Sequence, residues 1–139
     1  MTRLQIQRYQ VIVQGQTVQL EYDLDGDVME IFFKQGPASG AIELADPIIL
    51  RFDQETGQAL SLSILTFSHV IEATELGPRS FPLGGLESLP NKSREMVVKM
   101  ITTLPVSHFL KVAVYYPRSE QPPVPISYVE QSLALPVAA

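Results

Sequence analysis

Apolar and polar residues alternate on both sides of a short acidic turn near the start of the chain. Asp25-Gly26 is typical of a two-residue type I′ hairpin turn, which needs positive φ at both central positions. That turn aligns three wholly apolar cross-strand pairs, Val18 with Phe33, Leu20 with Ile31 and Tyr22 with Met29. Because a slip of one residue would expose all of them, burial sets the register. We therefore predict a β-hairpin with one apolar face.

A second hairpin with the same plan is predicted over residues 48–64. If Glu55-Thr56-Gly57 forms a three-residue loop with left-handed Gly57, the cross-strand pairs are again apolar. They are Ile48 with Ile64, Leu50 with Leu62 and Phe52 with Leu60. A four-residue loop would set Leu50 against Ser61 and mix the faces, so we predict the three-residue loop.

Further elements follow from shorter patterns. A first strand is predicted over residues 4–13, with a bulge or a bend near Gln7 and Arg8 where the alternation changes phase, and Gly15 favours a tight turn after it. Residues 68–76 fit a short helix and a strand equally well. The remaining predicted strands are a short edge strand at 41–44, a central strand buried on both faces at 109–116, and one more at 126–133.

One clear helix is predicted over residues 92–104. Asn91 is a favourable N-cap, Glu95 lies in the first turn, and Pro105 ends the helix. The apolar stripe consists of Met96, Val97, Met100, Ile101 and Leu104.

These elements predict an α+β fold in a single domain, residues 1–139. An antiparallel β-meander would carry the one main helix, residues 92–104, on one face. Residues 20–70 form the double-hairpin core, and residues 77–90 form a long loop rich in Pro and Gly. Residues 118–139 are expected to be a Pro-rich linker followed by a strand or tail.

Composition narrows the function classes. The 139 residues include no cysteine, which excludes disulfides, thiolate metal sites and cysteine nucleophiles and fits a cytoplasmic protein. The net charge of −5 without a basic cluster gives no footprint for nucleic acid, and no segment resembles a membrane span. The 45 % apolar content and mean hydropathy of +0.12 favour some exposed apolar surface, and therefore self-association.

The polar face of the first hairpin holds the candidate site. Glu21 lies opposite Glu30, and Asp23 is diagonal to Glu30, so the carboxylates repel unless the face is wet, binds a cation or pairs with an arginine. Arg51, on the outer face of the second hairpin, is the candidate partner if the strands adjoin. Glu21, Asp23 and Glu30 are also the candidate ligands for a divalent metal.

Other chemical motifs have ordinary structural explanations. The aspartates at 23, 25 and 27 alternate as in a calcium loop, but Val28 occupies the required Gly position and Lys34 the bidentate Glu position. His69 and His108 each follow a serine, yet neighbours on a strand point to opposite faces, so structural roles are expected. Leu83-Gly84-Gly85-Leu86 lacks the lysine of a phosphate cradle.

Part of the chain resembles a family of short bacterial domains catalogued as domain of unknown function 2283. The likeness covers about residues 20–70. It rests on the run from Tyr22 to Ile31, an apolar strand ending at Asp53, a turn at Gly57 and a strand from Leu62 to Ser68. Two positions depart from the family pattern, Glu30 in place of an aromatic residue and Ser63 in place of Glu. The resemblance implies a small β-rich fold and no agreed activity.

Two functions remain open. The first is a non-enzymatic protein-interaction or accessory domain, without a cofactor, that binds a protein or a second copy of itself through a strand edge or through residues 77–90. The alternative is an enzyme that uses the acidic face of the first hairpin, by carboxylate acid–base chemistry or with a divalent metal.

Overall fold

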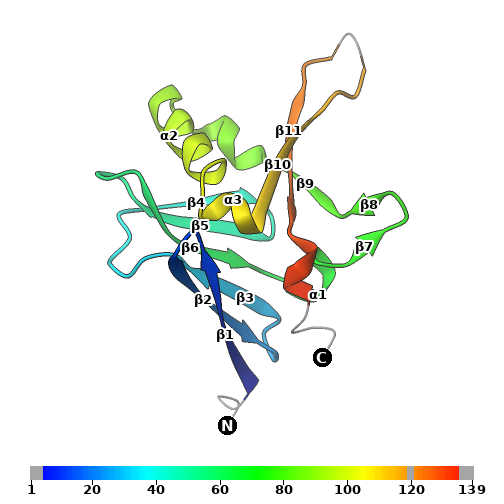
Figure 1. The fold of residues 1–139 in the computed structure, drawn as a ribbon. Helices are drawn as coiled ribbons and strands as arrows, with labels where there is room; N and C mark the ends of the chain where they lie inside the picture. The colour runs from blue at the N-terminus through cyan, green and yellow to red at the C-terminus, as the bar shows by residue number, and fades with distance from the viewer. Residues whose placement is uncertain (1–4, 119–120, 135–139) are drawn as a thin grey trace.

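The computed structural model describes residues 5–118 and 121–134, which form a largely antiparallel β structure with few helices (Figure 1). The larger sheet has six strands in the order β1-β2-β3-β6-β5-β4, and every neighbouring pair is antiparallel. Its strands are β1 (Ile6–Val13), β2 (Gln16–Asp23), β3 (Val28–Phe32), β4 (Gly40–Ala45), β5 (Ile48–Asp53) and β6 (Gln58–Ile64).

The remaining elements form a second layer and its connections. A three-stranded sheet has the order β10-β11-β9, and β7 and β8 form a small ribbon. These strands are β7 (Ala73–Thr74), β8 (Gly77–Pro78), β9 (Ser80–Pro82), β10 (Leu110–Tyr115) and β11 (Val124–Val129). The helices are α1 (Phe67–Val70), α2 (Asn91–Ile101) and α3 (Val106–Phe109), with 3₁₀ turns η2 (Gly84–Ser88) and η3 (Gln131–Ala134).

The first predicted hairpin is present in the predicted register, but its turn is different. Leu20 pairs with Ile31 and Glu21 with Glu30, as the alternation requires. The positive φ lies at Asp27 (55°) and not at Asp25 or Gly26, so the type I′ prediction is wrong and four residues connect the strands. Asp23 explains the difference, because its Oδ1 accepts the backbone N–H groups of Asp25 and Gly26 and holds them in a side-chain-capped turn.

Two consecutive residues of positive φ do occur, in the turn between β1 and β2. Gln14 has φ 47° and Gly15 φ 78°, and this two-residue turn connects the paired residues Val13 and Gln16. The register then runs unbroken to the far end of β1, so the bulge predicted near Gln7 and Arg8 is wrong.

The second hairpin keeps the predicted pairs near its base and loses one near its turn. Leu50 pairs with Leu62 and Arg51 with Ser61, as predicted, but Phe52 pairs with Ala59. Leu60 is therefore an extra residue in the strand, and the loop has four residues rather than three. On its other side, the Leu60 carbonyl accepts the N–H groups of Phe33 and Lys34 at 2.8 and 3.3 Å, which continues the β3–β6 pairing.

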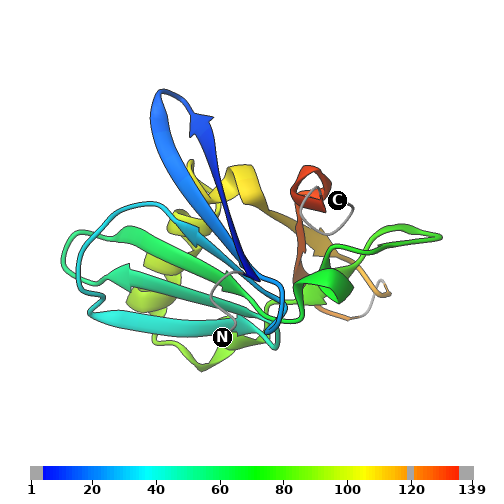
Figure 2. The same cartoon turned by 90° about the horizontal axis from the view of Figure 1, so that it is seen from below.

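A single cluster of buried side chains joins the inner face of the six-stranded sheet to the second layer. The inner face contributes the apolar residues at alternate positions of β2, β3, β5 and β6. Helices α2 and α3 lie on the same side of the β4–β5–β6 part of the sheet in both views, and Figure 2 shows the β1–β2 hairpin running at a steep angle to it. The second layer contributes Phe67, Val97, Ile101, Phe109, Leu110 and Val129, among others.

Helix α2 begins one residue earlier than predicted and ends three residues earlier. Asn91 is its first helical residue and Pro90 occupies the N-cap position, with no side-chain cap bond. The helix ends at Ile101, and Leu104 lies outside the core with 41 % of its surface exposed. Arg94 ties the helix to the preceding segment by donating to the carbonyls of Leu86, Glu87 and Leu89.

The prediction of a central strand at 109–116 is wrong. Strand β10 pairs only with β11 and forms the edge of the smaller sheet, and its second half is exposed. Tyr116, just beyond it, is 72 % exposed. The apolar run has the composition of a buried strand, but the larger sheet consists of β1 to β6, and the run forms part of the smaller sheet instead.

The segments of uncertain assignment acquire definite structure. Residues 68–76 contain the end of α1 and the strand β7, so both alternatives hold in part. Residues 77–90 are not an irregular loop, because they contain β8, β9 and η2, and β9 pairs with β11. The strand predicted at 126–133 begins at Val124 and ends at Val129, and the tail at 135–139 lies outside the described residues. None of the described helices is long and apolar enough to cross a membrane.

Candidate functional site

The predicted site residues lie on the outer face, the side of the six-stranded sheet opposite the core. Cross-strand pairing places Arg8, Glu21, Glu30 and Ser63 in one continuous row over β1, β2, β3 and β6. Arg51 lies in the adjacent row, next to Ser61. Strand β6 separates β5 from β3, so Arg51 does not adjoin the carboxylate strands directly.

Glu21 has a cationic partner that the sequence did not indicate. Arg8, its cross-strand neighbour on β1, places Nε 3.5 Å from Glu21 Oε2. Both side chains are partly exposed, at 66 % and 33 %, so water weakens this ion pair and its contribution to stability is small. The pair nevertheless relieves the repulsion between Glu21 and Glu30.

Glu30 is connected to Arg51 through a buried serine. Ser63 Oγ donates to Glu30 Oε2 at 2.7 Å, and Arg51 Nη1 donates to Ser63 Oγ at 2.7 Å. Ser63 is only 2 % exposed, so water has little access to the middle of the hydrogen-bonded chain Arg51–Ser63–Glu30. Arg51 was the candidate partner only if its strand adjoined the carboxylate strands; it does not bond to Glu30 directly, and Ser63 stands between them. The two positions that depart from the resembled family pattern, Glu30 and Ser63, are bonded to each other.

Asp23 does not join this group. Its Oδ1 is occupied by the turn N–H groups at 3.1 and 3.2 Å, which fixes the carboxylate at the end of the hairpin. Over residues 5–118 and 121–134, no three His, Asp or Glu side chains come together as a metal-binding group. Glu21, Asp23 and Glu30 therefore form no such group.

A concavity of about 610 Å³ opens on the outer face beside Glu21 and Arg51. Its floor includes Phe32, Leu60 and Ser61, and the segment 34–38 forms one wall. Glu30 and Ser63 are not among its lining residues, so the concavity lies beside the Glu21–Glu30 pair rather than over it.

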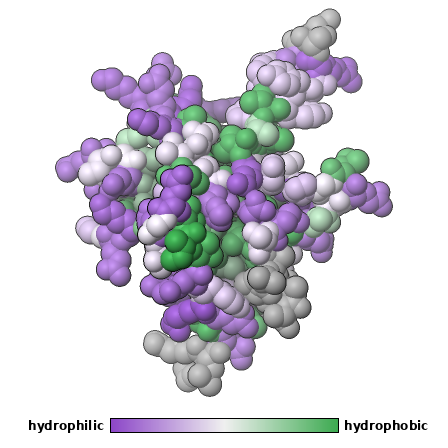
Figure 3. Space-filling view, viewed as in Figure 1, coloured by the Kyte–Doolittle hydropathy of each residue, from purple (hydrophilic) through white to green (hydrophobic). Residues whose placement is uncertain are grey.

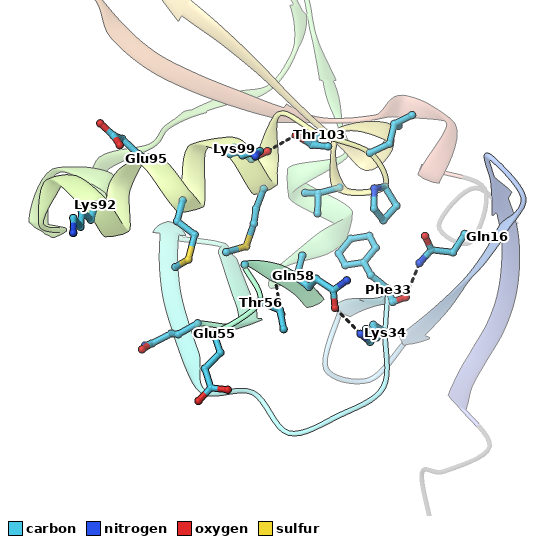
Figure 4. A pocket seen from close by; sticks show the side chains of 18 residues that line it. Gln16, Phe33, Lys34, Glu55, Thr56, Gln58, Lys92, Glu95, Lys99 and Thr103 are labelled. Carbon is cyan, nitrogen blue, oxygen red and sulfur yellow. Dashed lines mark hydrogen bonds between the residues drawn. The ribbon is translucent and has the colours of Figure 1, made fainter.

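A second concavity, of about 740 Å³, lies between the β5–β6 hairpin and helix α2 (Figure 4). Apolar groups from Met96, Met100 and Phe33 line it, and polar side chains stand at its border. Lys34, Lys92 and Lys99 and the carboxylates Glu55 and Glu95 all contribute, so the border carries both signs of charge.

Sequence reasoning missed a cluster where the first hairpin meets α1. Asp27 accepts hydrogen bonds from Tyr22 Oη at 2.7 Å, from Ser68 N–H at 2.9 Å and from Ser68 Oγ at 2.6 Å. Burial raises the pKa of the Tyr22 phenol to about 12, helped by the bond to Asp27 and by the charges of Asp27 and Asp23. Burial also acts to raise the pKa of Asp27, but the bonds from Ser68 and Tyr22 outweigh it and hold that pKa below its usual value.

The same cluster bears on the serine–histidine pairs. Ser68 Oγ donates a hydrogen bond to Asp27 Oδ2, so that hydroxyl proton is directed to Asp27. The His69 carbonyl accepts a bond from Arg79, and the His108 ring packs edge-on against Phe109 with 4.9 Å between centroids. The structural roles expected for His69 and His108 stay a prediction.

The two edges of the six-stranded sheet differ in exposure. At the β4 edge, η2 packs so closely that a Cβ on Gly85 would lie 1.9 Å from the Glu43 carbonyl oxygen. At the β1 edge, no described strand pairs on the outer side. Figure 3 shows apolar atoms gathered over the end of β1 nearest the turn, where Ile12 is 64 % exposed, and others over the β10–β11 hairpin.

Comparison with known protein families, with curated proteins and with solved structures gives no match for this chain. The resemblance to domain of unknown function 2283 therefore stays a prediction.

Proposed function

We propose that this chain is a non-enzymatic protein-interaction domain that pairs with a second copy of itself through strand β1. The observation that carries the proposal is the contrast between the two edges of the six-stranded sheet. Helical turn η2 covers the β4 edge, whereas at the β1 edge no described strand pairs with the outward-facing backbone.

Strand β1 lacks the features that protect an edge. Natural edges are short, bulged or interrupted by proline and inward charges. Strand β1 has eight residues in unbroken register, no proline or glycine, and a single charge. That charge, on Arg8, is already engaged with Glu21.

The turn identifies which backbone groups of β1 are free. Val13 and Gln16 flank a two-residue turn, so they form a hydrogen-bonded pair, and such pairs alternate along an antiparallel ladder. The N–H and C=O groups that point away from β2 therefore belong to Ile6, Arg8, Gln10 and Ile12.

A two-fold symmetric antiparallel pair of β1 strands can use all four of these residues. With Tyr9 facing its own copy at the centre, Arg8 lies opposite Gln10, and Ile6 lies opposite Ile12. This register sets no like charges against each other and buries the exposed Ile12 side chain. It would join two six-stranded sheets into one, with each outer face continuing across the dimer.

The experiment compares Gln10→Pro with Gln10→Thr. The proline removes an edge-facing N–H and leaves the β1–β2 bonds intact, whereas threonine keeps the N–H and favours strand. We expect the wild type and Gln10→Thr to change from 15.4 kDa towards twice that mass as concentration rises in sedimentation equilibrium, and Gln10→Pro to stay monomeric. A wild-type protein that is monomeric up to about 1 mM would overturn the proposal.

Helix α2 acts in this proposal as the one main helix that supports the sheet from its inner face, which leaves the β1 edge for the partner. The enzymatic alternative has less support, because Arg8 and Ser63 already engage the two central carboxylates, Glu21 and Glu30. The cytoplasmic location stays a prediction based on the absence of cysteine.

A further inference from the structure

Arg51 lines the concavity on the outer face, and its guanidinium has unused hydrogen-bond capacity. Arg51 is half-buried, and one of its five N–H donors bonds to Ser63 Oγ. Within residues 5–118 and 121–134, no carboxylate oxygen lies within 4.0 Å of it. Its charge is therefore unpaired at close range, while its side chain lines the concavity.

A second polar group in the floor is also unpartnered. Ser61 is 8 % exposed, and its hydroxyl makes no hydrogen bond to any residue that the structure describes. Ser61 is the cross-strand neighbour of Arg51 and lines the same concavity, so its Oγ and the guanidinium lie on one face of the sheet. No buried side-chain oxygen or nitrogen among the described residues lacks a hydrogen-bond partner, so the Ser61 hydroxyl is reached by solvent and is accessible to a ligand in the concavity.

The surroundings define what such a ligand would be. Lys34 also lines the concavity, but its Nζ donates to Gln58 of the other concavity, so the positive charge for a ligand comes from Arg51. Arg8 offsets the charge of Glu21, so the concavity favours an anion. Phe32 and Leu60 provide apolar floor next to the polar pair. A guanidinium fork matches a planar carboxylate, and about 610 Å³ is within the range of small-molecule sites.

We propose that the concavity between β2, β6 and segment 34–38 binds a small organic carboxylate, with the carboxylate on Arg51 and Ser61 and its apolar body against Phe32 and Leu60. This proposal is independent of strand pairing at β1, because Arg51 and Ser61 lie on β5 and β6.

Benzoate is a suitable probe, with benzamide as the uncharged analogue of the same shape and inorganic phosphate as an anion without an apolar body. Binding is measured by amide chemical-shift titration at pH 7 in the full chain. We expect saturable shifts for residues of β5, β6 and segment 34–38, with benzoate binding at least about tenfold more tightly than benzamide. Phosphate should bind more weakly than benzoate, since it does not use the apolar floor.

Four variants separate the contributions. Arg51→Gln should weaken benzoate binding by about tenfold or more, and Ser61→Ala by about fivefold. Glu21→Gln should strengthen it by about twofold, because it removes a negative charge at the rim. Lys99→Gln, in the other concavity, should leave it unchanged.

Circular dichroism checks that each variant folds. If Arg51→Gln does not fold, the site is still tested by the weaker benzoate binding expected for Ser61→Ala and the tighter binding expected for Glu21→Gln. Equal affinity for benzoate and benzamide, tighter binding of phosphate, or no saturable shift at about 10 mM benzoate would overturn the proposal. Repeating the titration in Gln10→Pro separates this outcome from failure of β1 pairing.

Discussion

Tyr22 donates a hydrogen bond of 2.7 Å to Asp27, and through that carboxylate the first hairpin is joined to Ser68 at the start of α1, 41 residues away. The phenol is buried against Phe67, with 5.4 Å between ring centroids. Local turn geometry and a long-range contact thus depend on the same side chain. This arrangement makes the stability of the fold sensitive to pH at both ends of the scale.

Alkaline pH should destabilise the protein through Tyr22. The folded pKa of about 12 exceeds the ordinary value of 10.0, so the stabilisation is fully present below pH 10 and is lost as pH rises through 12. We expect a loss of about 2–3 kcal/mol in the free energy of unfolding, measured by urea titration from pH 9 to 12. Tyr22→Phe should be about 1 kcal/mol less stable at pH 7 and should lack this component of the alkaline loss. Parallel curves for the two proteins would contradict the role of Tyr22.

Acidic pH should act through Asp27. Its folded pKa is lowered, so its contribution is present above the ordinary value of 3.8 and is lost as pH falls through the folded value. Asp27→Asn tolerates the positive φ but cannot accept all three hydrogen bonds, and we expect a loss of about 2 kcal/mol at pH 7. The difference from wild type should narrow below pH 3.8 in thermal unfolding, and a difference that does not change with pH would contradict this account.

The two buried serines of β6 should respond differently to truncation. Ser63→Ala breaks both hydrogen bonds of the Arg51–Ser63–Glu30 chain, so the half-buried charges of Arg51 and Glu30 each lose a hydrogen-bond partner. We expect a loss of about 2 kcal/mol in the free energy of unfolding. Ser61→Ala removes a hydroxyl that has no partner among the described residues, and should change the free energy of unfolding by less than about 0.5 kcal/mol. Urea unfolding of both variants tests the contrast, and equal losses would show that Ser63 has no special role.

The covered β4 edge should be intolerant of a methyl group at Gly85. A Cβ there would lie 1.9 Å from the Glu43 carbonyl oxygen, so η2 must move off the strand in Gly85→Ala, at a cost of about 2–3 kcal/mol. Gly84→Ala is the matched control, because nothing lies within 4 Å of its Cβ position. Melting temperatures measure both effects. A Gly85→Ala variant as stable as Gly84→Ala would show that η2 does not hold this edge closely.

Residues of the two hairpins were predictable because each strand has one buried face. Leu20 and Ile31 must turn inward together, and this places Glu21 opposite Glu30 on the reverse side. The turns were less predictable. Asp23 accepts two backbone N–H groups, and these side-chain bonds overrode the preference of Asp25-Gly26. In the second hairpin an extra residue, Leu60, shifts the register and lengthens the loop predicted at Glu55-Thr56-Gly57.

Only part of the candidate site could be predicted from the sequence, for a related reason. Glu21, Glu30 and Arg51 could be placed on one face by alternation alone. Their connection through Ser63, and the vacant donors of Arg51 beside Ser61, depend on β6 lying between β3 and β5. A serine gives no signal by itself, because its role depends on which strand becomes its neighbour.

By itself the amino-acid sequence determined the pairs away from the turn of each hairpin, such as Leu20 with Ile31 and Leu50 with Leu62, since alternation and burial act over a few neighbouring positions. Only the tertiary structure decided which strand became an edge, which loop covered it and where Asp27 found Ser68. The apolar run at 109–116 shows why: its composition is that of a buried strand, yet β10 lies at an edge. Whether that strand is buried depends on how the two layers pack, and this packing involves every element of the chain at once.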